Sequence, residues 1–243
     1  MWNKPPQSLI LNYNEVHIWM INTENYHQKI DSFYKILFDD EQEKVNTFAS
    51  DLFKKRFIIT RAYLKIILSR YLKIKPEKIY LKYNSKGKPE LDTLLFDIQF
   101  NLSHKNNYII YSFSKHTIGI DLEKIDHKTK VEKIAERFFC KNEFDYLKQL
   151  DLREKEDYFF KLWTKKEAYL KAIGEGLSGG LDSICFFNNK SKPKMNLIQD
   201  NNINYNWYFK TWILADDYIM SIAINSPIKP KFYYYSELGI IDN

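Results

Sequence analysis

The chain is poor in cysteine, which limits the ways in which its fold can be held together. Only Cys140 and Cys185 occur among its 243 residues, and they form neither a CxxC motif nor a zinc-ligand spacing. A chain of this length buries roughly 70–75% of its unfolded surface, so a hydrophobic core can stabilise it without a disulfide framework. We therefore expect a cytoplasmic protein with reduced thiols and no structural zinc site.

Long apolar segments are also lacking. No run of residues approaches the ~20 apolar positions that a helix needs to cross a bilayer. The N-terminal sequence MWNKPPQ does not show the basic and then apolar layout of a signal peptide. The sequence thus predicts neither a membrane protein nor a secreted one.

Arginine is scarce, although the chain is basic. The formal net charge is +6, and nearly all of the basic residues are lysines. Three of the few arginines, Arg56, Arg61 and Arg70, fall within one short segment. A basic balance suits a nucleic acid, but clustered arginines with nearby lysines favour a smaller phosphorylated ligand.

The apolar pattern predicts an α+β fold of two similar halves. Hydrophobic residues are 44% of the chain, and their spacing of three and four predicts helices over Asp51–Lys73 and Arg153–Ile173. Arg56 and Arg61 project off the apolar stripe of the first helix. Strands are predicted over residues 16–21, 96–102, 108–113, 117–123, 205–212 and 218–224. We expect the halves to be residues 1–115 and 116–243.

Two carboxylates share one face of the predicted strand at residues 117–123. Alternate residues of a strand point to the same side, so Gly119, Asp121 and Glu123 lie opposite the apolar face. Two carboxylates beside a residue without a side chain suit a hard cation next to a bulky anion. A solvated strand face would give the same pattern.

A third carboxylate falls on the apolar stripe of the second long helix. Trp163, Glu167 and Leu170 are spaced i, i+4 and i+7, so Glu167 is expected to be buried. A buried carboxylate needs a cation or hydrogen-bond donors. Lys171, one turn further on, could supply a simple helical ion pair, or Glu167 could join Asp121 and Glu123 in a magnesium site.

Five motifs follow one another in the order that they have in a known family. They are Gly87-Lys-Pro89, Asn101-Leu-Ser-His104, Ile118-Gly-Ile-Asp-Leu-Glu123, Arg137-Phe-Phe with Glu143 after it, and Trp163-Thr-Lys-Lys-Glu-Ala-Tyr-Leu-Lys171 followed by Gly174 and Gly176. In these motifs, over roughly residues 44 to 180, the chain resembles the 4′-phosphopantetheinyl transferases. The resemblance is to the monomeric two-half type that activates peptide synthetases and other carrier proteins.

The resemblance implies a holo-[acyl-carrier-protein] synthase reaction. Coenzyme A would bind with Mg²⁺ on its pyrophosphate, where the cation neutralises charge that grows on the leaving group. A serine of an apo carrier protein, an acidic helical domain, would attack the phosphorus that bears the pantetheine arm, and adenosine 3′,5′-bisphosphate would leave. We also expect a monomer whose halves are related by a pseudo-twofold axis, with the active site in the cleft between them.

The resemblance also implies a role for each matching residue. Asp121, Glu123 and Glu167 match metal ligands. Glu143 matches a glutamate that activates the serine, and Lys171 matches a lysine that contacts the phosphate and can neutralise the leaving group. The nucleotide and its phosphates are expected to contact Lys44, Arg56, Lys88, Ser103 and His104.

Other classes of protein remain as alternatives. A non-catalytic module that binds a carrier protein or coenzyme A would be expected to have lost a carboxylate, and none is lost. In a nucleic-acid-binding protein the three carboxylates would repel phosphate. An unrelated magnesium-dependent phosphohydrolase would use water as the acceptor. The sequence leaves open which carrier protein is modified.

Overall fold

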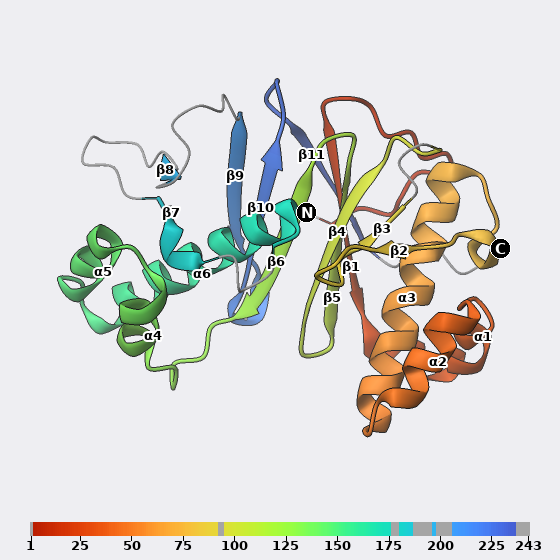
Figure 1. The fold of residues 1–243 in the computed structure, drawn as a ribbon, viewed down its shortest axis with the longest axis horizontal. Coiled ribbons are helices and arrows are strands. Elements are labelled where there is room, and N and C mark those ends of the chain that lie inside the picture. The colour runs from red at the N-terminus through yellow and green to blue at the C-terminus, as the bar shows by residue number, and fades with distance from the viewer. Residues whose placement is uncertain (1, 92–94, 176–179, 187–195, 198–205, 237–243) are drawn as a thin grey trace. The chain divides into compact units, whose positions relative to one another are not determined.

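The chain folds into two compact units. The computed structural model describes residues 2–91, 95–175, 180–186, 196–197 and 206–236. One unit comprises residues 1–115 and 231–243, and the other comprises residues 116–230. Each unit packs helices against a sheet in which most strand pairs are antiparallel (Figure 1), so the expected α+β class is confirmed.

Unit 1 is built around a long helix that packs on a sheet with the strand order β11-β1-β5-β4. Its elements are β1 (Glu15–Asn22), η1 (Thr23–Lys29), α1 (Ile30–Tyr34), α2 (Asp39–Thr47), α3 (Asp51–Leu72), η2 (Pro76–Lys78), β2 (Lys82–Tyr83), β3 (Pro89–Glu90), β4 (Gln99–Lys105), β5 (Tyr108–Ser114) and β11 (Lys231–Ser236).

Unit 2 repeats this plan with a sheet in the order β6-β10-β9. Its elements are β6 (Ile118–Lys124), α4 (Val131–Phe138), α5 (Lys141–Lys148), α6 (Leu152–Ile173), η4 (Leu181–Ser183), β7 (Ile184–Cys185), β8 (Asn196–Leu197), β9 (Trp207–Ile213), η5 (Ala215–Asp217) and β10 (Tyr218–Asn225).

The two units share one chain path. In each, a first strand is followed by helices that end in a 22-residue helix, α3 or α6. A pair of two-residue strands and two longer strands then complete the unit, and the first strand pairs with the last of these, β1 with β5 and β6 with β10. The expectation of two similar halves is therefore confirmed.

One strand of unit 1 was missing from the sequence-based expectation. β11 pairs in parallel with β1, with Ile18 opposite Tyr234, although residues 231–243 were expected to lie in the second half. The strand follows Pro230 and contains Phe232 and three tyrosines, which are residues that favour strands. β11 has no counterpart in unit 2 among the described residues.

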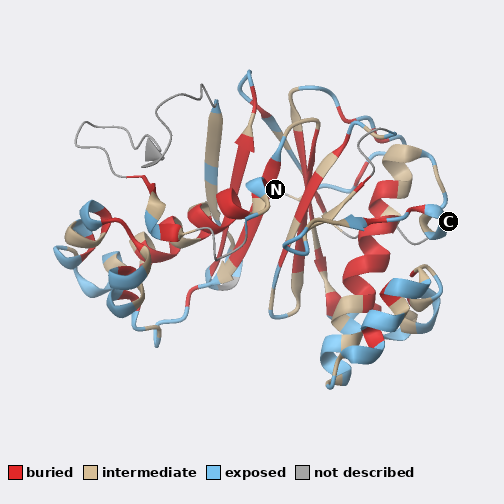
Figure 2. Cartoon of the chain, viewed as in Figure 1, coloured by how far each residue is buried: buried red, intermediate tan, exposed pale blue. Residues whose placement is uncertain are grey.

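The two long helices carry much of each core. Figure 2 shows buried residues along α3 and α6 and in the central strands of each sheet. The predicted helices at 51–73 and 153–173 are confirmed within one residue at each end. The side chain of Asp151 caps the first turn of α6 by accepting the Glu154 N–H, and Gly174 ends the helix with a left-handed φ of 78°.

The strand predicted at residues 96–102 lies three residues further along the chain. β4 spans Gln99–Lys105, and its pairing with β5 continues to Lys105 opposite Tyr108. Ser103 and His104 are thus inside a strand, although the sequence pattern placed them after it. The apolar alternation ends at Leu102, but backbone hydrogen bonds to β5 extend the strand beyond that pattern.

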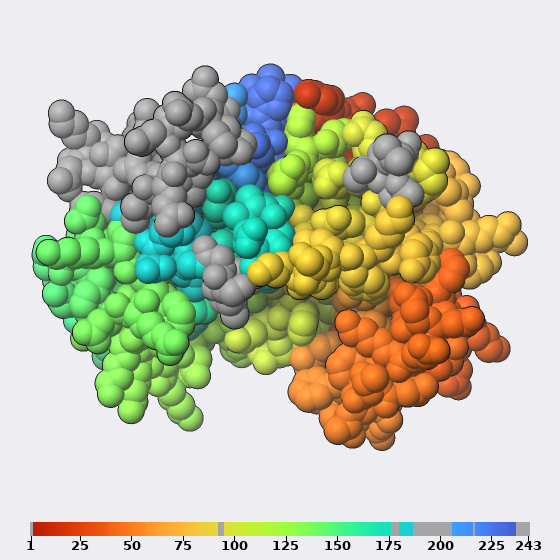
Figure 3. Space-filling model, in the orientation of Figure 1, coloured from red at the N-terminus to blue at the C-terminus, as the bar shows by residue number. Residues whose placement is uncertain are grey.

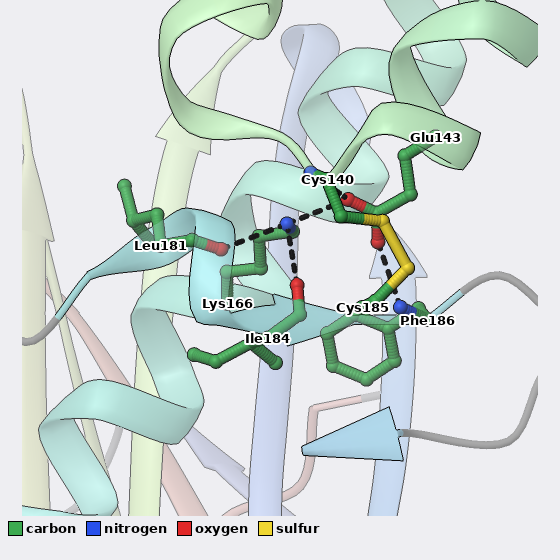
Figure 4. The surroundings of a disulfide bond; sticks show 7 residues. All are labelled: Cys140, Glu143, Lys166, Leu181, Ile184, Cys185 and Phe186. Carbon is green, nitrogen blue, oxygen red and sulfur yellow. Dashed lines mark hydrogen bonds and ion pairs between the residues drawn. A yellow bond between two sulfur atoms is a disulfide. The ribbon is translucent and has the colours of Figure 1, made fainter. Parts of the chain in front are cut away.

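The expectation of reduced cysteines is wrong for this structure. Cys140 and Cys185 form a disulfide with an S–S distance of 2.07 Å (Figure 4). The two residues are 45 positions apart, and a spacing of this kind contains no local signal of pairing. The fold brings them together because Cys140 precedes α5 and Cys185 lies in β7, which packs beside it.

Candidate active-site residues

Strand β6 and helix α6 bring the acidic residues of unit 2 together. Asp121 is 3% exposed, and its Oδ1 accepts a hydrogen bond from Lys171 Nζ at 2.6 Å. Glu167 is buried on the same helix as Lys171, as its spacing predicted. The ion pair of Lys171 with Asp121 links α6 to the strand, so Lys171 is more than an i, i+4 partner of Glu167.

Gly119 allows α6 to approach this strand. A Cβ atom at Gly119 would lie 1.9 Å from the backbone oxygen of Ala168 and 2.5 Å from the backbone nitrogen of Ala172. Only glycine therefore fits against the helix at this point. The sequence pattern suggested room for an anion beside Gly119, whereas in the structure helix backbone fills that space.

The carboxylates of Asp121 and Glu123 lie close enough to Glu167 to influence its ionisation. Burial raises the pKa of Glu167 to about 7, and the negative charges of Asp121 and Glu123 raise it further against the opposing effect of Lys171. A carboxyl group with such a pKa is stabilised by a nearby cation when it ionises.

The donor set suits a hard divalent cation. Among the described residues, the ligand atoms of Asp121, Glu123 and Glu167 do not all lie within 4.8 Å of one another, so they form no closed cage. Mg²⁺ is usually bound by one or two carboxylates together with water and substrate phosphates, which fits an open group of this kind. The residues present therefore fit the expected magnesium ion.

Unit 1 contains a pocket between α3 and β4. Its cavity volume is about 220 Å³. The side chains that line it are mostly aromatic or cationic: Phe48, Phe53, Arg56, Phe57, Thr60, Arg61, Leu102 and His104. Two of the five residues expected to hold a nucleotide, Arg56 and His104, thus meet in one pocket. Aromatic faces beside guanidinium groups suit a ligand that combines a planar ring with phosphate.

Two family models of 4′-phosphopantetheinyl transferases match the chain, one over each unit. Residues 117–223 match the family described as the 4′-phosphopantetheinyl transferase superfamily, and residues 22–116 match the 4′-phosphopantetheinyl transferase N-terminal family. The chain is 35% identical over 180 residues to the 4′-phosphopantetheinyl transferase HetI of Nostoc sp., which covers 73% of this chain and 76% of that protein. The chain belongs to the 4′-phosphopantetheinyl transferase superfamily.

Other members of the superfamily match over most of their length. A putative 4′-phosphopantetheinyl transferase of Synechocystis sp. is 32% identical over 214 residues, with 85% of each chain covered. The 4′-phosphopantetheinyl transferase Sfp of Bacillus subtilis is 30% identical over 206 residues, with 82% of this chain and 87% of that protein covered. These matches identify the chain as an enzyme of this superfamily.

Arg61 is a candidate site residue that the sequence analysis did not select. It was expected to project off the apolar stripe of α3, but it is only 8% exposed. Its guanidinium carbon lies 5.3 Å from the Phe57 ring and 5.2 Å from the Tyr83 ring. Within the described part of the chain, Nε and Nη1 are buried without a hydrogen-bond partner. An arginine five residues after Arg56, next to aromatic residues, was the available signal.

The other expected nucleotide residues lie near the pocket or apart from it. Lys44 Nζ is 5.8 Å from the Phe57 ring and 5.6 Å from the Tyr83 ring, so it shares both rings with Arg61. Lys88 is in the turn before β3, and its backbone N–H is held by Asn84; burial lowers the pKa of its ammonium group. Figure 3 shows the yellow segment with β2 and β3 beside the orange helices of unit 1.

Ser103 does not line the pocket. It is buried on β4 between Leu102 and His104, which both line the pocket, and neighbouring residues of a strand point to opposite faces. Its predicted contact with the nucleotide would therefore have to be made on the other face of β4. Gly176, named in the last sequence motif, lies outside the described residues.

Glu143, expected to activate the serine, is completely buried. Its Oε2 accepts the Cys140 N–H at 3.2 Å and lies 2.6 Å from Lys166 Nζ, while Oε1 accepts the Phe186 N–H at 2.7 Å. Figure 4 shows these contacts around the disulfide. Both carboxylate oxygens are thus occupied by groups of the protein itself.

Proposed function

We propose that the chain transfers the 4′-phosphopantetheine arm of coenzyme A to a serine hydroxyl of an apo carrier protein and releases adenosine 3′,5′-bisphosphate. Membership of the superfamily supports this reaction. The observation that supports it most within the structure is the meeting of Glu167 and Lys171 of α6 with Asp121 of β6.

The acidic residues would hold the metal ion of the reaction. Asp121, Glu123 and Glu167 offer the carboxylate oxygens that Mg²⁺ prefers. When bound, Mg²⁺ supplies charge neutralisation at the pyrophosphate as the leaving group departs. Lys171 is held beside these carboxylates by Asp121, from where its ammonium group can donate a hydrogen bond to a phosphate oxygen.

The pocket of unit 1 would bind the nucleotide part of coenzyme A. Arg56 and His104 supply cationic or hydrogen-bonding groups, and Arg61 supplies buried N–H groups that are not used within the described structure. Lys44, Lys88 and Ser103 stay as predicted contacts of the same ligand. The two sets of residues are proposed to act on one coenzyme A molecule.

The chain is further proposed to act as a cytoplasmic monomer on an acidic helical carrier domain. Both sets of residues are present in one polypeptide, and a net charge of +6 favours encounter with an acidic partner. No described helix is both long enough and apolar enough to cross a membrane. Light scattering at working concentration would test the monomer.

Incubation with coenzyme A, Mg²⁺ and a panel of apo carrier proteins would test the reaction. Intact mass measurement should show one phosphopantetheine added to each accepted carrier, and a carrier whose serine is replaced by alanine should stay unmodified. If coenzyme A is cleaved with water as the only acceptor, the chain is a phosphohydrolase. If it binds coenzyme A or a carrier without turnover, it is a non-catalytic module.

A further inference from the structure

Glu143 and Lys166 form an ion pair that the solvent does not reach. Both side chains are 0% exposed, and their charged atoms are 2.6 Å apart. Lys166 also donates to the backbone oxygens of Leu181 at 2.9 Å and Ile184 at 2.7 Å. An ammonium group has three protons to donate, so these three acceptors satisfy it completely.

The pair joins three segments of unit 2. Glu143 belongs to the first turn of α5, and Lys166 lies in the second half of α6. Apart from Cys140, which directly precedes α5, their backbone partners lie between Leu181 and Phe186. The Cys140–Cys185 disulfide connects two of the same segments (Figure 4). The contacts therefore form one buried connection between α5, α6 and the residues that lead into β7.

Unit 1 contains a corresponding ion pair, although Glu41 Oε1 is buried without a hydrogen-bond partner among the described residues, unlike Glu143 Oε1. Glu41 lies in the first turn of α2, its Oε2 accepts the Phe38 N–H at 3.0 Å, and it forms a buried ion pair with Lys65 of α3. Lys65 also donates to the backbone oxygen of Ile36. In each unit the glutamate is the third residue of its short helix, and the lysine is the fifteenth residue of the 22-residue helix.

The acidic group, in contrast, occurs in one unit only. The residue after the lysine is Glu167 in α6 but Ile66 in α3, and the position of Lys171 corresponds to Arg70. A contact present in both units belongs to the common fold, whereas a group confined to one unit belongs to its chemistry. This comparison indicates that Glu143 and Lys166 support the fold, whereas Glu167 and Lys171 serve the reaction.

A residue that accepts a proton must come within hydrogen-bond reach of it. Both oxygens of Glu143 are already held by two backbone N–H groups and Lys166, in a place closed to solvent. A carrier serine could reach this carboxylate only if the ion pair were broken. Burial also lowers the pKa of Lys166, which the charge of Glu143 opposes.

We propose that Glu143 and Lys166 are a positioning pair that fixes the rotation of α6, and that Glu143 accepts no proton in the transfer reaction. Consecutive residues of a helix point about 100° apart, so anchoring Lys166 sets the direction of Glu167. The pair would thus hold Glu167 toward Asp121 and Glu123. The proposal rests on the proposed function for its catalytic part, but its structural part can be measured without turnover.

Three variants separate a positioning pair from a catalytic base: Glu143→Gln, Lys166→Met and the double variant. Each single change leaves one uncompensated group in the interior, and the double change leaves no buried charge. A positioning pair predicts that both single variants bind Mn²⁺ at least tenfold more weakly, measured by electron paramagnetic resonance. It also predicts that the double variant recovers at least tenfold in kcat over Glu143→Gln.

A catalytic base predicts the opposite pattern. Lys166→Met, which keeps the carboxylate, would retain kcat, while the double variant would be folded and as inactive as Glu143→Gln. That result would overturn the proposal. If the double variant does not fold, Lys166→Arg decides instead, because it keeps the charge but changes its geometry; unchanged Mn²⁺ affinity and activity in that variant would contradict a positioning role.

The pair in unit 1 provides a matched control. Glu41→Gln alone should lower stability, and Glu41→Gln with Lys65→Met should restore part of it, while neither should change Mn²⁺ affinity of the folded protein. A tenfold change in Mn²⁺ affinity from unit 1 would contradict the proposal. If the wild-type chain modifies no carrier, the proposed function fails, and the Mn²⁺ measurements still decide whether Glu143 and Lys166 position Glu167.

Discussion

Arg61 differs from Arg70 on the same helix in what surrounds its guanidinium group. Arg70 Nη2 donates to the backbone oxygen of Pro6 at 2.6 Å and leaves one buried atom, Nη1, without a hydrogen-bond partner, whereas Arg61 has two such atoms in the described structure, Nε and Nη1. Buried polar groups are nearly always hydrogen-bonded in proteins. Arg61 also lines the pocket with Arg56, and we propose that an anionic group of coenzyme A supplies the missing partner.

Arg61→Met should therefore weaken coenzyme A binding more than it slows the chemical step. The loss of a charge-assisted hydrogen bond costs ~1.5–3 kcal/mol, which corresponds to a rise of about tenfold or more in KM for coenzyme A. Steady-state kinetics would measure it, with Arg70→Met as the control on the same helix. A large fall in kcat at constant KM would contradict the binding role.

The charge state of Glu167 depends on its buried surroundings. Burial, with Asp121 and Glu123, raises its pKa to about 7 from the usual 4.5. Without Mg²⁺ the folded chain therefore keeps a proton that the unfolded chain has released, so stability should fall as the pH rises from 4.5 to 7.

Glu167→Gln should remove the loss of stability with rising pH and abolish magnesium-dependent transfer. The amide cannot ionise, so in a chelating buffer at pH 8 the variant should be more stable than wild type by ~1–3 kcal/mol. Denaturant unfolding at several pH values would measure the difference. Equal stability at pH 8 would contradict the raised pKa of Glu167, and full transfer activity in the variant would show that Glu167 is not part of a metal site.

At the scale of elements, the packing of α6 on β6 decides where the carboxylates lie. The helix backbone at Ala168 and Ala172 occupies the place where a side chain at Gly119 would begin. Asp121, two residues after Gly119, accepts a hydrogen bond from Lys171, which lies between Ala168 and Ala172 on the helix. A small change in the distance between the helix and the strand would thus move the ligands of the proposed metal ion.

Gly119→Ala should lower both stability and activity. The added methyl group would overlap backbone atoms of α6, and overpacking of this kind costs ~1–3 kcal/mol or more. Thermal unfolding and the Mg²⁺ concentration needed for half activity would both be measured. Thr117→Ala, an exposed change on the same segment, is the control, and a Gly119→Ala protein with unchanged values would disprove the close approach.

The sequence predicted those elements that begin and end at recognisable capping residues. Helix α6 begins at a capping aspartate and ends at a glycine with positive φ, and its spacing placed Glu167 on the buried face. Strand β11 was not predicted, because its partner β1 lies more than two hundred residues earlier and no local pattern connects them. The disulfide and the Glu143–Lys166 ion pair were not predicted for the same reason, because each depends on contacts between residues that are distant in the sequence.

At the scale of the whole molecule, the two units share one fold but differ in the side chains of their candidate sites. Both units keep the buried glutamate–lysine pair. Unit 1 adds a pocket of aromatic and cationic side chains, and unit 2 adds three carboxylates and Lys171. The order of elements in the sequence predicted similar halves, and the strand order of the two sheets confirms the prediction.

The central claim is that this chain transfers phosphopantetheine from coenzyme A to a carrier serine with the help of Mg²⁺. The most direct measurement follows adenosine 3′,5′-bisphosphate by chromatography and the carrier by intact mass in the same reaction. One bisphosphate should be released for each serine modified, and neither product should form when Mg²⁺ is chelated. Release without carrier modification, or an unmodified carrier of every type with coenzyme A and Mg²⁺ in excess, would contradict it.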